Sequence, residues 1–149
     1  MSDSPAIDPP LTPVMTVISV APYLLYCHLT IFPRPDSVPS PKDTSIAPEP
    51  LILNVALADT PVAMSLSVFV YSIPIVASTS KQMPVSTTLL GGKDSASQEA
   101  AEFATRLSRA LALHTKRPVY VGVAAGLGRF LPQVEAAEKI LAFVQDSLR

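Results

Sequence analysis

Cysteine and histidine are scarce in this chain of 149 residues, which has one cysteine, Cys27, and two histidines, His28 and His114. A lone cysteine cannot form an intramolecular disulfide, which fits a reducing compartment. We therefore predict that the protein is in the cytoplasm, and in the nucleus as well. Cys27 and His28 are neighbours in a strand-like segment, where adjacent side chains point to opposite faces, so they cannot bind one metal ion together. His114 is expected at a helix end, where an imidazole suits the helix dipole. These scarcities predict no catalytic residues, no metal site and no cofactor.

Charged side chains are also few: they make up 15% of the residues, against about 25% in an ordinary soluble domain, and the net charge is -1. Without an excess of lysine and arginine, no nucleic-acid partner is expected. Residues 14–32 form an uncharged apolar run of 19 residues, close to the length that spans a membrane. Pro22 interrupts this run and its β-branched residues favour strands, so we predict no membrane partner. A small membrane-associated protein remains the alternative.

Glycine is outnumbered by proline, five to sixteen, and eleven prolines lie in the first fifty residues. Because proline fixes φ and lacks an N–H, residues 1–13 are predicted to be a flexible tail and residues 33–50 a proline-rich inserted loop. Residues 14–149 have the length of a single domain. Gly126, Gly128 and Arg129 lie between a predicted strand and a predicted helix, but no Walker A or dinucleotide pattern surrounds them. We interpret this segment as a structural turn, with an anion-binding loop as the alternative.

Hydrophobic periodicity predicts the secondary structure. A period of two indicates strands at residues 23–32, 66–73 and 119–125, and the strand at 66–73 is apolar on both faces and therefore central. Residues 51–58 are predicted to be a further strand, and residues 85–90 a short strand or extended segment that ends at Gly91 and Gly92. A period of 3.6 indicates one helix from Ser95 to just before Pro118 and a second from Pro132, and Ser95 with Gln98 resembles a capping box. The buried faces are predicted to be Ala100, Phe103, Ala104, Leu107 and Leu111 in the first helix and Val134, Ala137, Leu141, Val144 and Leu148 in the second. The order β-β-β-β-α-β-α predicts an α+β fold, a mostly antiparallel sheet of five to six strands packed with two amphipathic helices.

Three segments occur in an order that is similar to one known family. They are Pro-Val-Ser-Thr-Thr-Leu-Leu-Gly at 84–91, Ala-Thr-Arg-Leu-Ser-Arg at 104–109 and Arg-Pro-Val-Tyr-Val-Gly at 117–122. Together they resemble the proteasome assembly chaperone 4 family, and Phe69-Val70-Tyr71 resembles its fungal-type members. The resemblance covers residues 66–148. The matching positions, to which we assign structural roles, are Pro84, Ser86, Thr87, Leu89, Leu107, Val119, Tyr120 and Val121.

The resemblance implies a non-catalytic assembly chaperone. Such a protein pairs with a related chaperone of the chaperone 3 type as a heterodimer and binds an α-type subunit, with alpha-5 as the expected one, while the α-ring of the 20S proteasome assembles. The high apolar content of the chain agrees with a protein that reserves surface for a partner. Positive charge gathers toward the first helix and its end, and Arg106, Arg109, Lys116 and Arg117 are the residues predicted to bind the proteasome subunit.

Overall fold

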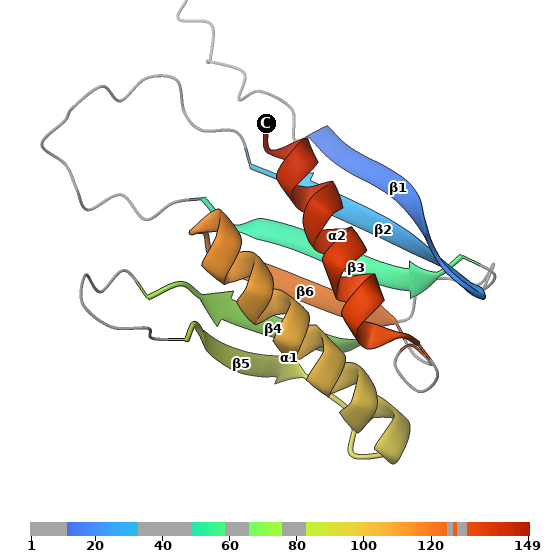
Figure 1. The fold of residues 1–149 in the computed structure, drawn as a ribbon. Coiled ribbons are helices and arrows are strands. Elements are labelled where there is room, and N and C mark those ends of the chain that lie inside the picture. The colour runs from blue at the N-terminus through green and yellow to red at the C-terminus, as the bar shows by residue number, and fades with distance from the viewer. Residues whose placement is uncertain (1–11, 33–48, 59–65, 76–82, 125–126, 128–130) are drawn as a thin grey trace, which may run out of the picture.

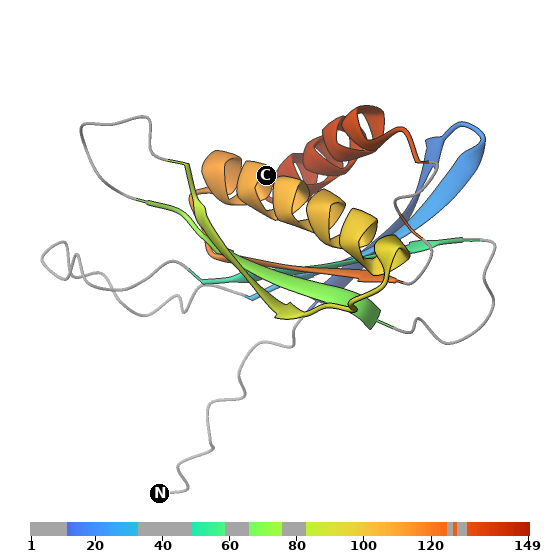
Figure 2. The ribbon, with the colours of Figure 1, turned by 90° about the horizontal axis from the view of Figure 1, so that it is seen from below.

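The chain forms two layers, a six-stranded sheet and a pair of helices that both lie on one face of it (Figures 1 and 2). This computed structural model describes residues 12–32, 49–58, 66–75, 83–124, 127 and 131–149. The elements are β1 (Thr12–Val20), β2 (Tyr23–Ile31), β3 (Leu51–Leu57), β4 (Leu66–Ile73), β5 (Val85–Leu90), α1 (Ser95–Thr115), β6 (Val119–Ala124) and α2 (Gln133–Ser147).

The strands lie in the order β1-β2-β3-β6-β4-β5. The β3–β6 pair is parallel and the other four pairs are antiparallel. The predicted α+β class and the mostly antiparallel sheet are confirmed. The interior position predicted for β4 is also confirmed, because that strand pairs with β5 on one side and β6 on the other.

β1 is the element that the predicted order lacks. It begins at Thr12, inside the segment expected to be a tail, and it pairs with the whole length of β2. Pro13 is tolerated there because β1 is an edge strand, where a missing N–H leaves no neighbour unpaired. The rest of the predicted tail, residues 1–11, and most of the predicted proline-rich loop, residues 33–48, lie outside the described residues.

The core lies between the sheet and the helices. Alternate residues of β2, β3, β4 and β6 are buried on the helix side, among them Leu25, Cys27 and Leu29 of β2, as the period of two predicts. Across from them, α1 lies over β4 and β6 and buries all five residues of its predicted apolar face. One buried hydrogen bond joins the layers, between the hydroxyls of Ser72 in β4 and Ser108 in α1, 2.7 Å apart.

The second helix is rotated from the face predicted for it. α2 buries Ala136, Ile140 and Val144, whereas Val134, predicted to be buried, is 74% exposed. The helix is apolar over more of its circumference than the sheet can cover, and the residues that complete its packing are spaced four apart. The Lys139 ammonium donates a 2.7 Å hydrogen bond to the Ser19 carbonyl, which holds this helix over the end of β1.

The helix ends differ in detail from the prediction. The N-cap of α1 is Asp94 rather than Ser95, and its carboxylate accepts a 2.6 Å hydrogen bond from the Ser97 hydroxyl. That bond holds the pKa of Asp94 below its ordinary value. At the other end Lys116 terminates the helix in a left-handed conformation, with φ 57°, just before the predicted stop at Pro118. No helix among the described residues is long and apolar enough to cross a membrane.

Candidate partner-binding surfaces

The face of the sheet opposite the helices is not covered by any other element in the described part of the chain (Figure 2). Apolar and aromatic side chains from five of the six strands gather on this face. We call them the open sheet face, and they are Met15, Val17, Leu24, Tyr26, Phe69, Tyr71, Ile73, Val85, Leu90 and Tyr120. Val17, Ile73 and Val85 are each about half exposed, at 53%, 45% and 55%.

Three aromatic rings form the centre of this face. The ring of Tyr120, in β6, stacks on Tyr71 with the centroids 4.3 Å apart and on Phe69 with the centroids 5.6 Å apart, both in β4. Burial and the adjacent Tyr120 hydroxyl raise the pKa of Tyr71, and a phenol is neutral at physiological pH even at the ordinary pKa of 10.0. The rings therefore form a flat, uncharged and rigid surface, the kind of side chain that is enriched at protein interfaces.

A hollow of about 200 Å³ interrupts the same face where β6 has a glycine. Gly122 lies between Asn54 of β3 and Phe69 of β4 in the sheet register. A Cβ atom at this position would collide with the Asn54 side-chain oxygen and with a methyl group of Leu66. The absence of a side chain at Gly122 therefore leaves room beside the aromatic rings.

The three family-like segments are brought together by the fold. Arg109 of α1 donates a 2.8 Å hydrogen bond from Nε to the Ser86 hydroxyl of β5, which joins the second segment to the first. Pro84, Leu107, Val119 and Val121 are buried, and Tyr120 lies in the aromatic stack. Thr87 and Leu89 are exposed on β5. Most of these positions pack the sheet against α1, whereas Tyr120, Thr87 and Leu89 are accessible on the surface.

The four basic residues do not form a single patch at the end of the helix. Arg106 and Arg109 lie in the middle of α1 and line one shallow surface depression, whereas Lys116 and Arg117 follow the helix. Ten residues of helix separate Arg106 from Lys116 along the axis, roughly 15 Å. The ion pairs of the described residues are Lys139–Glu135 and Arg149–Asp146, so Arg106 and Arg109 have no carboxylate partner there.

Cysteine and histidine occur at three positions of the described chain, Cys27, His28 and His114. Burial raises the pKa of the Cys27 thiol to about 12, which keeps it protonated and unreactive. His28 lies on β2 beside Met15 and Asn54, and His114 is exposed in the last turn of α1. Among the described residues no group of three histidine, cysteine or acidic side chains could hold a metal ion. Gly126, Gly128 and Arg129, the alternative anion-binding loop, lie outside the description.

A small α+β domain with an uncovered apolar sheet face has the features of a protein-binding domain. Comparison with known sequences identifies its family. Residues 42–124, more than half of the chain, match the sequence profile of the family described as proteasome assembly chaperone 4. The chain therefore belongs to the proteasome assembly chaperone 4 family, as its three segments predict. The match begins before Leu66, where the predicted resemblance started, and ends before α2.

A solved structure has a similar fold. The chain resembles one from the "Crystal Structure of a Novel Chaperone Complex for Yeast 20S Proteasome Assembly", with a TM-score of 0.59 and 22% sequence identity. The alignment covers 93% of this chain and 94% of that one. At this identity the likeness establishes the fold. No curated protein sequence matches the chain.

Proposed function

We propose that this protein is a non-catalytic assembly chaperone that pairs with a related chaperone of the chaperone 3 type and binds an α-type subunit, alpha-5, during assembly of the 20S proteasome α-ring. Membership of the proteasome assembly chaperone 4 family supports the role. The fold it shares with a chain of a yeast chaperone complex supports pairing with a second chaperone. We expect the protein in the cytoplasm and the nucleus, where its substrates would assemble.

The proposed pairing with a second chaperone rests on the open sheet face. Half-exposed valine and isoleucine side chains, together with partly buried tyrosines, form a larger apolar surface over several strands than scattered exposed residues would. A partner that covers this face would remove it from water and bury the aromatic rings at the centre of the interface, where binding energy is concentrated. The helices on the far side of the sheet leave the face accessible (Figure 2).

The basic residues would then contact the proteasome subunit. Arg106 and Arg109 lie on the helix side of the sheet, away from the open sheet face, so the two partners can bind at the same time. Lys116 and Arg117 extend the positive charge toward the end of the helix. Exposed charges of this kind set the orientation and the rate of association more than the affinity.

Co-expression with the chaperone 3 type protein from the same organism tests the pairing. Val17→Lys in β1 and Ile73→Lys in β4 each place a charge on a half-exposed position of the open sheet face, in different halves of the sheet. Leu113→Lys is the matched control, because Leu113 is 41% exposed on α1, on the other side. We expect the control to co-purify with the partner and at least one sheet variant to lose it while keeping its melting temperature. If both sheet variants pair like the unmodified chain, the open sheet face is not the interface.

Capture of alpha-5 by the chaperone pair tests the second contact. The double substitution Arg106→Glu and Arg109→Glu reverses charges on α1 that have no carboxylate partner in the described residues. Capture is expected to weaken, and more at low than at high salt, while the chaperone pair stays intact. Unchanged capture at physiological salt would remove these residues from the interface.

A further inference from the structure

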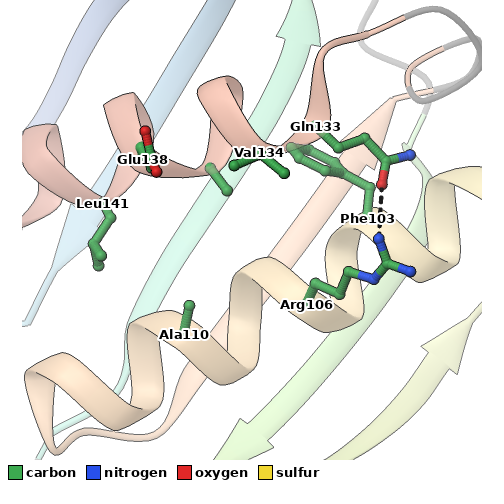
Figure 3. A pocket seen from close by; sticks show the side chains of 8 residues that line it. Phe103, Arg106, Ala110, Gln133, Val134, Glu138 and Leu141 are labelled. Atoms are coloured by element: carbon green, nitrogen blue, oxygen red, sulfur yellow. Dashed lines mark hydrogen bonds between the residues drawn. The ribbon is translucent and has the colours of Figure 1, made fainter.

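A groove runs between the two helices, on the surface of the helix layer that faces away from the sheet (Figure 3). Its volume is about 270 Å³. Most of its lining is apolar, with three polar side chains at the margins. The lining residues are Phe103, Arg106 and Ala110 from α1 and Gln133, Val134, Ala137, Glu138 and Leu141 from α2.

The groove exists because small side chains lie where the helices face each other. The two helices run in the same direction (Figure 1). Ala110 of α1 and Ala137 of α2 line the groove, and their side chains are too short to fill it. Val134 stands at the edge of the groove and is 74% exposed, although α2 completes its packing on the sheet without it. An exposed valine beside an unfilled apolar groove leaves hydrophobic surface that a bound side chain would cover.

The open shape of the groove suits a protein segment, whereas pockets for small ligands enclose most of the ligand surface. The lining on α1 extends from Phe103 to Ala110, two turns or roughly 10 Å of helix. This length matches the i, i+3 or i+4, and i+7 spacing at which an amphipathic helix inserts its apolar side chains into a groove.

Charged side chains at the two ends of the groove indicate which charge a bound helix would carry at each end. At one end Arg106 donates a 3.4 Å hydrogen bond from Nη1 to the Gln133 side-chain oxygen and has no carboxylate partner within the described ranges. Arg109 does not line the groove, because its side chain is directed to β5, where it donates a hydrogen bond to the Ser86 hydroxyl. Glu138 lies toward the opposite end, beside Leu141 (Figure 3). A complementary helix would therefore carry an acidic side chain at the first end and a basic one at the other.

We propose that this groove binds an amphipathic helix of the α-type subunit that the chaperone holds, a contact that rests on the function proposed above. The apolar side chains of that helix fill the space between Ala110 and Ala137, its acidic side chain pairs with Arg106, and its basic side chain faces Glu138. The subunit is the occupant because the groove lies on the same side as the basic residues of α1 and away from the open sheet face, which the partner chaperone covers. Arg106, the basic residue of α1 that lines the groove, thus forms the positive margin of an apolar binding site.

Two variants block the groove in different ways. Ala110→Phe fills it from α1, and Val134→Glu places a carboxylate at its edge beside Arg106. Val134 is so exposed that its replacement is expected to leave the fold intact, and Leu113→Glu is the matched control because Leu113 is exposed on α1 but does not line the groove. The dissociation constant for recombinant alpha-5 would be measured with each chaperone pair. We expect both groove variants to weaken binding by roughly tenfold or more, as for a central interface residue, and the control to change it less than about twofold.

The outcomes separate this inference from the proposed function. If the unmodified pair captures alpha-5 and both groove variants capture it equally well, the groove is not the site and the chaperone function stands. If the unmodified pair captures no α-type subunit, the proposed function itself fails. If the groove variants lose the partner chaperone instead, the assignment of the occupant is overturned. Hydrogen exchange of the unmodified pair gives an independent measurement, because bound alpha-5 should slow exchange in the groove-lining turns of α1 and α2 but not in β1.

Discussion

The buried hydrogen bond between Ser72 and Ser108 should show strong coupling in a double-mutant cycle. Both side chains are fully buried between β4 and α1. The Ser108 hydroxyl donates a 3.0 Å hydrogen bond to the Thr105 carbonyl, so the Ser72 hydroxyl must be the donor in the bond between the two serines. In Ser108→Ala the Ser72 hydroxyl loses its acceptor and remains buried, which costs about 1–3 kcal/mol of stability. In Ser72→Ala the Ser108 hydroxyl keeps its bond to the carbonyl, and the loss is about 1 kcal/mol.

The double variant should be more stable than the sum of these losses predicts, because no hydroxyl is left without a partner. A coupling energy of about 1–2 kcal/mol is expected. Urea unfolding of the four proteins measures it, and each 1 kcal/mol corresponds to roughly 2–4 °C in the melting temperature of a chain of this size. Ser95→Ala, at an exposed position of α1, should change stability by less than about 0.5 kcal/mol. If the stability loss of the double variant equals the sum of the two single losses to within about 0.5 kcal/mol, the two hydroxyls are not hydrogen-bonded to each other as described.

Three further predictions concern single positions. The Cys27 thiol ionises at its ordinary pKa of 9.0 when the chain is unfolded and at about 12 when it is folded. The stability that the buried thiol contributes is therefore complete below pH 9 and declines as the pH rises from 9 toward 12. The stability difference between the unmodified chain and Cys27→Ala, measured by urea unfolding, should therefore narrow by about 1.4 kcal/mol from pH 8 to pH 10, and a constant difference would contradict the burial of the thiol. Lys116→Gly should stabilise the protein by about 0.5–1 kcal/mol because it relieves the left-handed φ of 57°, whereas Lys116→Ala should not raise the melting temperature. Gly122→Ala should lower stability by less than about 1 kcal/mol, since the colliding atoms are the ends of the Asn54 and Leu66 side chains; loss of the fold would show that they cannot move.

The elements with a regular pattern could be predicted from the sequence, whereas their arrangement could not. The period of two in β2 and the period of 3.6 in α1 identify buried residues correctly, because the residues that face the core recur at the period of each element. The pattern of α2 fails at Val134 because apolar residues surround more than one face of that helix. β1 was missing from the predicted order because Pro13 suggests an irregular segment, and only its edge position makes the proline acceptable.

The candidate surfaces show a similar division. The basic residues were predicted as a group from their positions along the chain, but the length of α1 separates Arg106 and Arg109 from Lys116 and Arg117. The stack of Phe69, Tyr71 and Tyr120 depends on β6 lying beside β4, a pairing between segments about fifty residues apart that no local pattern records. The groove likewise depends on where two alanines meet between helices.

The position of β6 has a consequence for how the chain folds during synthesis. β6 pairs with β3 on one side and β4 on the other, although both strands are made well before it. The β1-β2-β3 and β4-β5-α1 units can therefore form early, but they join into one sheet only when residues 119–124 have left the ribosome. Until then two inner strands present unpaired edges, which are templates for pairing with other chains. The nascent protein is consequently most prone to aggregation just before its last strand emerges, and any truncation that removes β6 would leave it in that state.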